Sequence, residues 1–223
     1  MTHKMKTISA TTMATRTAII LFVFTIVFTA ILAGVYVLTK PAIDASTALE
    51  KMRSIGEVLP QSRYDNALLK DTLELPPTAE LGLDDTSTVY RARRGGEPAA
   101  LVLETMATDG YSGKIRLLVG VNIDGSLSGV RVTQHKETPG LGDYIDPKKD
   151  KNKEHPWINQ FDGLSLEKVA QREWKVKKDG GRFDFMAGAT ISPRAVVKAV
   201  AKALKYVAEN RDKLYAGPSA AAE

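Results

Sequence analysis

One stretch of the sequence can be accommodated only in a membrane or deep inside a protein. Residues 17–39 carry no charged side chain and are rich in Ile, Leu, Val and Phe. As a helix, these 23 residues would extend about 34 Å, enough to cross the hydrocarbon layer of a bilayer with a modest tilt. We therefore predict a single transmembrane helix over residues 17–39, preceded by a short N-terminal segment of residues 1–16.

A cleaved signal peptide is the alternative interpretation, because Ala30 and Ala33 are small residues of the kind found near cleavage sites. The apolar run exceeds the roughly 7–15 residues of a signal-peptide core, and this length favours a retained anchor. A lipoprotein signal is excluded, since the chain has no cysteine to acylate.

The charges on either side of the apolar stretch predict its orientation. Lys4, Lys6 and Arg16 precede it, and no acidic residue occurs among the first 16 residues. The chain beyond the stretch carries mixed charge. By the positive-inside rule, the N-terminus should lie in the cytoplasm and the rest of the chain on the opposite side of the membrane.

The composition limits the chemistry of the remaining chain. The formal net charge is +5, but without the three cations that precede the apolar stretch 28 basic residues face 26 acidic ones. This balance gives no reason to expect nucleic-acid binding. Because there is no cysteine, disulfides, Fe–S clusters and zinc–thiolate sites are excluded. Any redox chemistry must come from a cofactor that needs no thiolate ligand.

A connector should follow the apolar stretch, over residues 40–86. Apolar residues recur on one side of the chain from Pro41 to Val58, which predicts a helix that ends near Gly56 and Pro60. Residues 61–86 show little pattern, and we interpret them as connecting chain with at most one more short helix. The whole segment is predicted to be a helical connector.

Residues 87–215 have the pattern of one antiparallel sheet with packed helices. Two pairs of strand-like runs are joined by glycine-containing turns and predict two hairpins, 88–93 with 98–104 and 114–121 with 127–135. A final helix is predicted over Pro193–Leu214, with Ser192 as its N-cap. The predicted fold class is therefore α+β, followed by a disordered tail of residues 216–223.

A threonine hydroxyl precedes this final helix, in the motif Asp184-Phe-Met-Ala-Gly-Ala-Thr190. The first amides of a helix lack internal partners and carry partial positive charge, so a phosphate beside Thr190 would be stabilised. Gly188 and Ala189 are small enough to let the backbone approach that phosphate. A loop in which Thr190 merely satisfies a backbone amide is the alternative.

The motif Glu137-Thr-Pro-Gly-Leu-Gly142 has a composition suited to wrapping backbone around a flat ligand. A plain Gly-Pro turn without a ligand is the alternative. His135 and His155 have no convincing third ligand at useful spacing, so we expect no metal site. No pair of carboxylates suggests acid–base catalysis, and we expect no catalytic residue.

In this order and spacing, the two motifs resemble those of the G subunits of the Rnf ion-translocating electron-transport complexes, members of the FMN-binding family. The resemblance covers roughly residues 42–207. It implies FMN joined to Thr190 as a phosphoester, installed from FAD by a dedicated flavin transferase. Position 187, usually Ser or Thr in the family, is Ala187 here. The implied cofactor-binding residues are Thr190, Gly188, Ala189, Ser192, Asp184, Glu137, Thr138, Leu141 and Gly142.

Within this set, the resemblance implies that Glu137, Thr138, Leu141 and Gly142 contact the flavin ring. Asp184 is expected to shape the attachment loop or to help the transferase hold its metal.

The resemblance further implies a membrane-anchored electron carrier with no substrate turnover of its own. It would pass electrons between other subunits of a complex of ferredoxin and NAD type that drives ion translocation. The place implied is the bacterial inner membrane, with the main domain in the periplasm. The alternatives are the C subunit of a sodium-pumping NADH:quinone reductase, a flavin-free scaffold, and a stand-alone reductase. The last lacks support because no Gly-x-Gly-x-x-Gly motif is present.

The lysine-rich segment 144–156 is a separate feature with two interpretations. A solvated loop is favoured over a face that docks a partner.

Overall fold

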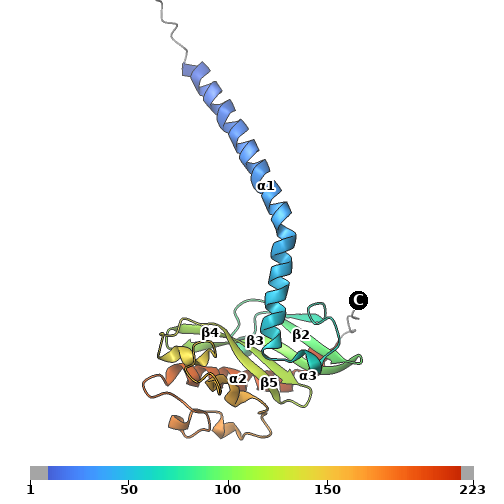
Figure 1. The fold of residues 1–223 in the computed structure, drawn as a ribbon, viewed down its shortest axis with the longest axis vertical. Coiled ribbons are helices and arrows are strands. Elements are labelled where there is room, and N and C mark those ends of the chain that lie inside the picture. Colours follow the sequence, from blue (N-terminus) through green and yellow to red (C-terminus); the bar gives the residue numbers. More distant parts are fainter. Residues whose placement is uncertain (1–9, 217–223) are drawn as a thin grey trace, which may run out of the picture. The chain divides into compact units, whose positions relative to one another are not determined.

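The computed structural model describes residues 10–216, and the chain divides into two units, Met1–Leu49 and Glu50–Glu223. Helix α1 (Ala10–Gly56) makes up the described part of the first unit and continues into the second (Figure 1). Lys4 and Lys6 of the orientation argument lie outside the described residues, as does the predicted tail apart from Ala216.

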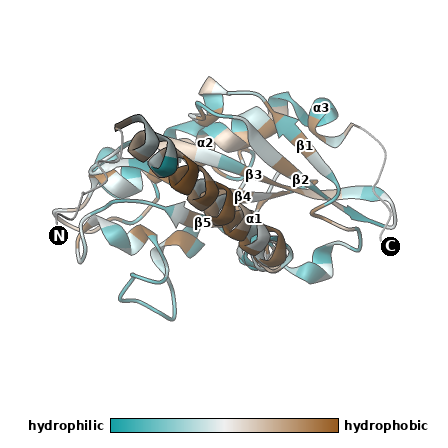
Figure 2. Cartoon of the chain, turned by 90° about the horizontal axis from the view of Figure 1, so that it is seen from above, coloured by the Kyte–Doolittle hydropathy of each residue, from teal (hydrophilic) through white to brown (hydrophobic). Residues whose placement is uncertain are grey.

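Helix α1 confirms the prediction of a long apolar helix at residues 17–39. It is the one helix among residues 10–216 that is long and apolar enough to cross a membrane, and its most apolar part has no buried residue. In Figure 2 much of the α1 ribbon has the colour of hydrophobic residues. Thr25 donates its hydroxyl to the Leu21 carbonyl at 2.8 Å, so this polar side chain is satisfied within the helix itself.

An antiparallel sheet of five strands in the order β1-β2-β3-β4-β5 forms the centre of the second unit. The two predicted hairpins are confirmed as β2–β3, where Arg91 pairs with Leu101, and β4–β5, where Val119 pairs with Val130. Gly125 has a positive φ of 79° in the β4–β5 turn, where a side chain would be strained. The strands are β1 (Thr72–Leu75), β2 (Ser87–Arg94), β3 (Glu97–Gly110), β4 (Gly113–Asn122) and β5 (Leu127–Gln134).

Both faces of the sheet are buried, and alternate residues of the strands face different cores. Leu101 and Leu103 of β3 belong to the core that includes Val196 and Val200 of helix α2 (Ile191–Glu209). The intervening Val102 belongs to a second core, with Ile55, Val58 and Leu59 at the end of α1 and beyond it. This is the period of two expected for a strand covered on both sides.

Two glycines allow the chain at Val58 to lie directly on the sheet. A Cβ atom at Gly120 would stand 2.7 Å from the carbonyl oxygen of Val58, and one at Gly129 would stand 3.0 Å from the same residue. Both glycines are therefore required by the close approach of backbone to backbone.

Two boundaries differ from the sequence predictions. The segment 61–86, interpreted as connecting chain, contributes strand β1 to the edge of the sheet, where Thr72 pairs with Tyr90. A four-residue strand that is followed directly by Pro76 is too short to show an alternating pattern. The last helix begins at Ile191 with Thr190 as its N-cap residue, two positions before the predicted start. It ends at Glu209 and is followed by the short helix α3 (Arg211–Tyr215).

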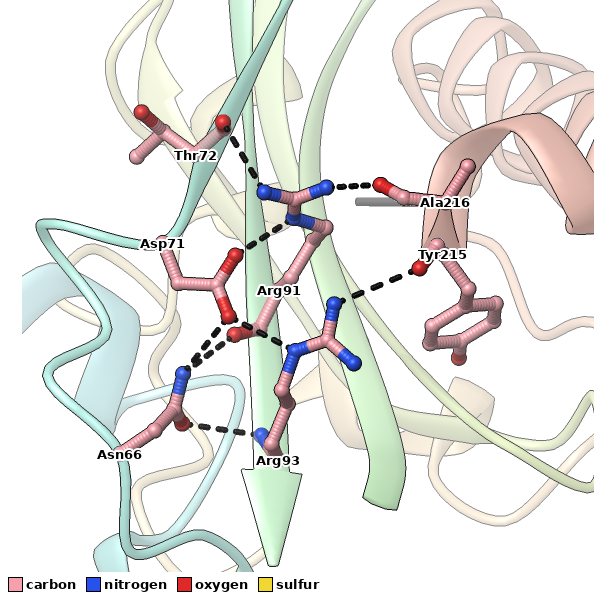
Figure 3. Close-up of polar contacts among 7 residues, drawn as sticks. All are labelled: Asn66, Asp71, Thr72, Arg91, Arg93, Tyr215 and Ala216. Carbon is pink, nitrogen blue, oxygen red and sulfur yellow. Dashed lines mark hydrogen bonds and ion pairs between the residues drawn. The ribbon is translucent and has the colours of Figure 1, made fainter. Parts of the chain in front are cut away.

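A buried ion cluster joins the end of α3 to the edge of the sheet (Figure 3). Asp71 is fully buried and accepts hydrogen bonds from Nε of Arg91 at 2.6 Å and Nε of Arg93 at 2.8 Å. The two guanidinium groups donate in turn to the carbonyl oxygens of Ala216 and Tyr215. One carboxylate thus organises two strand residues and the C-terminal end of the described chain.

Replacing Asp71 by Ala should destabilise the protein by about 3–5 kcal/mol, because two buried guanidinium groups would lose their counter-ion. The measurement is urea unfolding of the full chain in detergent, followed by tryptophan fluorescence. Asp84→Ala is the matched control, since Asp84 pairs with Lys114 at an exposed site, and no measurable change is expected there. Equal unfolding midpoints for the two variants would contradict the assignment.

Candidate functional site at the start of helix α2

A tight turn leads the chain into helix α2. The N–H of Ala189 donates to the Met186 carbonyl at 3.0 Å and closes the turn. Gly188 lies inside it with a φ of +85°, a region in which residues with a Cβ are strained. Thr190 follows the turn immediately, so the path of the backbone places this residue at the first turn of the helix.

Thr190 and the first helical amides offer unused hydrogen-bonding groups. Thr190 is 7% exposed, and its side chain makes no capping hydrogen bond. Within the described residues, the N–H groups of Ile191 and Ser192 donate to no protein acceptor. A hydroxyl and two polarised amides are thus gathered at the positive end of a 19-residue helix. This arrangement suits an anion.

Glu137 connects three segments around this helix start. Its side chain is 4% exposed. One carboxylate oxygen accepts the N–H of Ser112, in the β3–β4 turn, at 3.0 Å. The other accepts the hydroxyl of Ser192 in the first turn of α2. Because both oxygens have protein donors, we interpret Glu137 as a residue that positions the loop.

Two glycines leave room for the Glu137 carboxylate. A Cβ atom at Gly142 would lie 2.8 Å from one carboxylate oxygen and 2.4 Å from Oγ of Ser192. A Cβ atom at Gly110 would lie 2.9 Å from the other carboxylate oxygen. Gly142 therefore matters because the loop packs directly on the start of α2.

Apolar side chains are exposed on both sides of this contact. Leu141 precedes Gly142 and is 48% exposed, while Ile191 precedes Ser192 and is 42% exposed. The N–H of Leu141 donates to the carbonyl of Thr138 at 3.1 Å, which closes the loop. The loop and the helix start therefore present aliphatic groups suited to covering the apolar part of a ring.

Tyr144 is a site residue that the sequence analysis did not identify. Its hydroxyl accepts the N–H of Met186 at 3.0 Å and donates to the carbonyl of Ala189 at 3.3 Å, so it bridges the two ends of the turn. Burial raises the pKa of Tyr144 to about 12, which keeps the donor proton in place at neutral pH. Its ring packs edge-on against Trp157, with 5.8 Å between the ring centroids. Nothing in the sequence near Tyr144 signals this long-range contact.

Asp184 contributes to the site through its backbone. Its carbonyl accepts the indole N–H of Trp157 at 2.7 Å, and its N–H donates to the side chain of Gln160 at 2.9 Å. Its carboxylate is 58% exposed and pairs with Lys177. The structure therefore brings Glu137, Gly142, Thr190 and Ser192 together, while the charge of Asp184 faces solvent.

A hollow of about 490 Å³ lies beside the segment that leads into the turn before Thr190. Asp184, Phe185 and Met186 line one part of it, and Tyr144 and Trp157 line another. Its volume is within the range of small-molecule sites. In the described chain, no group of three His, Asp or Glu residues could hold a metal ion.

Comparisons with known proteins bear on the same residues. Residues 110–205 match the FMN-binding domain family, and residues 5–58 match the RnfG N-terminal region. The G subunit of the ion-translocating oxidoreductase complex of Pseudomonas aeruginosa (strain UCBPP-PA14) is 46% identical over 206 residues, which are 92% of this chain and 94% of the relative. The chain belongs to the family of these G subunits.

Other G subunits of such complexes are similarly close. Those of Shewanella loihica and of Vibrio cholerae (strain M66-2) are each 40% identical over 204 residues, or 92% of this chain. They are covered over 94% and 95% of their own lengths. The resemblance inferred from the two motifs is thereby confirmed, and both motifs lie inside the FMN-binding match.

The residues present fit FMN. Its phosphate needs donors, and the amides of Ile191 and Ser192 are available beside the Thr190 hydroxyl. Its ring needs apolar cover, and Leu141 and Ile191 are exposed next to that end of the helix.

Glu137→Ala should lower the free energy of unfolding by about 1–3 kcal/mol, because the Ser112 amide and the Ser192 hydroxyl would lose their acceptor. Glu137→Gln should lower the free energy of unfolding less. The amide oxygen of Gln still accepts one hydrogen bond, and the Ser192 hydroxyl can rotate to accept a hydrogen bond from the amide NH₂ group. Urea unfolding of the full chain in detergent measures the free energy of unfolding of both variants. A loss for Gln as large as that for Ala would contradict the positioning role.

Tyr144→Phe should destabilise the protein by about 1 kcal/mol at neutral pH, because the Met186 amide would lose its acceptor. The pKa of Tyr144 is raised from 10.0 to about 12, so its stabilising contribution is complete below pH 10 and lost as the pH rises through 12. The difference between wild type and variant should therefore shrink from pH 10 to 12 in equilibrium unfolding. A constant difference over this range would exclude the titration.

Proposed function

We propose that this chain is a membrane-anchored electron-transfer subunit that carries FMN covalently on Thr190. It would serve in a complex that couples electron transfer, of ferredoxin and NAD type, to ion translocation. The observation that carries the proposal is the free Thr190 side chain at the start of α2, beside two unpaired amides and inside the FMN-binding match.

The attachment is a phosphoryl transfer. The Thr190 oxygen forms a bond to the phosphorus of the FMN half of FAD, the bond between the two phosphates of FAD breaks, and AMP leaves. The hydroxyl proton is released at the same time. A dedicated flavin transferase would supply FAD and perform the transfer. The amides of Ile191 and Ser192 would then donate to the bound phosphate oxygens.

Residues of this chain hold the attachment loop in a fixed geometry. Tyr144 ties both ends of the turn before Thr190, and Glu137 ties the loop containing Leu141 to the helix start. FMN supplies one- and two-electron redox chemistry when bound. Because a tethered cofactor keeps a set distance to its redox partners, we expect electron relay between subunits and no turnover of a diffusible substrate.

Helix α1 and its flanking charges support a proposal for the membrane topology. We propose that α1 is a retained single-pass anchor in the bacterial inner membrane, with the N-terminus in the cytoplasm and the main domain in the periplasm. The match to the RnfG N-terminal region includes the apolar stretch, which supports a retained anchor over a cleaved signal. The C subunit of a sodium-pumping quinone reductase is not favoured, because the close relatives are named as G subunits.

The decisive experiment is in-gel flavin fluorescence of the denatured full chain, produced together with the transferase. We expect a fluorescent wild-type band whose mass exceeds the polypeptide by one FMN less one water. Thr190→Leu should abolish the fluorescence. Thr133→Ala, at an exposed position near the end of β5, should keep it. A dark wild-type band would refute the covalent attachment and favour the flavin-free scaffold. A fluorescent Thr190→Leu band would instead place the flavin on another residue and refute Thr190 as the acceptor.

A further inference from the structure

A groove of about 820 Å³ lies beside α2 and shares no lining residue with the attachment site described above. Apolar groups of Leu166, Trp174 and Ala201 contribute to its lining. Trp174 is only 7% exposed, whereas Leu166 is 38% exposed. The apolar part of the groove is therefore partly recessed, within reach of an inserted side chain.

Basic residues dominate the charge of the groove. Only one lining residue, Asp179, is acidic. Arg194, Lys198 and Lys202 follow each other at intervals of four residues, so they form a row along one side of α2 with about 6 Å between neighbours. The basic lining residues are Lys175, Arg194, Lys198, Lys202 and Lys205.

Part of this positive charge is not neutralised within the chain. Asp179 is paired with Arg194 at 2.6 Å, and Asp109, outside the groove, is paired with Lys198 at 2.7 Å. Among residues 10–216, Lys175 and Lys202 have no ion-pair partner, and both side chains are exposed. The groove therefore presents a net positive charge around an apolar part.

We propose that this groove docks an acidic, amphipathic segment of a neighbouring subunit of the complex. Carboxylates of that segment would meet Lys175 and Lys202, and an aliphatic or aromatic side chain would enter beside Trp174. The partner's membership of the complex rests on the proposed function, whereas the chemistry of the docked segment rests on the groove itself.

The shape of the groove favours a protein segment over a lipid surface. A bilayer surface is broad, and anchoring on it requires apolar side chains that project from the protein. Here Trp174 is recessed, so a flat membrane could reach the lysines but not the indole. A peptide segment can contact both the lysines and the indole of Trp174, because its side chains project by several ångströms from its backbone.

The first test is zero-length carbodiimide cross-linking of the assembled complex in native membranes, followed by peptide mass spectrometry. We expect amide bonds between Lys175 or Lys202 and Asp or Glu residues of another subunit. The double variant Lys175→Arg/Lys202→Arg keeps the charge but removes the amines. It should lose these cross-links and still co-purify with the complex.

The second test is co-purification with the tagged full chain. Lys175→Glu/Lys202→Glu should reduce recovery of the cross-linked subunit at least tenfold. The matched control Lys148→Glu/Lys149→Glu changes two exposed lysines outside the groove and should not. Flavin fluorescence of each band reports the FMN attachment separately. Dark bands would therefore contradict the proposed function, whereas the recovery of the subunit alone tests docking in the groove.

Two outcomes would overturn the docking proposal. One is that these lysines form cross-links only within the chain and that charge reversal leaves the complex intact. The other is that the isolated chain, reconstituted in phosphatidylglycerol vesicles, shields Lys175 and Lys202 from acetylation as fully as the complex does. That result would assign the groove to a lipid surface.

Discussion

The buried carboxylate of Glu137 holds together the part of the molecule on which the proposed chemistry depends. A carboxylate is costly to remove from water unless hydrogen bonds replace the solvent. Here the Ser112 amide and the Ser192 hydroxyl supply them, and the positive end of α2 adds a favourable field. The glycines at 110 and 142 are the steric condition for this arrangement, because a Cβ at either position would occupy the space of the carboxylate.

The same helix end would serve a second anion when FMN is attached. Glu137 engages the hydroxyl of Ser192 and leaves the amides of Ile191 and Ser192 without a protein acceptor. The donors are thus divided, with a side-chain hydroxyl for the carboxylate and backbone amides for the phosphate. Donors held in place before the ligand arrives need no reorganisation, which lowers the free-energy cost of binding. The N-terminal turn is therefore organised around two negative charges.

The sequence predicted those parts of the fold that depend on local patterns. Both hairpins were expected because alternating strands flank turns such as Asp124-Gly125, and Thr190 was identified because its motif is contiguous. The start of α2 was misplaced by two residues because Ser192 followed by Pro193 has the local pattern of a helix start. In the fold, the Ser192 hydroxyl is engaged by Glu137, 55 positions earlier. Tyr144 and the Asp71 cluster were missed for the same reason, since their partners are distant in sequence.

Helix α2 packs on the core, forms the proposed FMN site and borders the groove. Different residues take these three roles, because the helical period and the length of the helix place them on different sides and at different ends. Val196, Val200 and Leu204 face the core, and their burial against β3 fixes the position of the helix. The residues at 190–192 form its N-terminal end, and the row that includes Lys198 and Lys202 borders the groove. A helix rises about 1.5 Å per residue, so Lys202 lies about 18 Å along the axis from Thr190. A subunit docked in the groove would therefore be held at a distance from the flavin set by helix geometry rather than by a flexible loop.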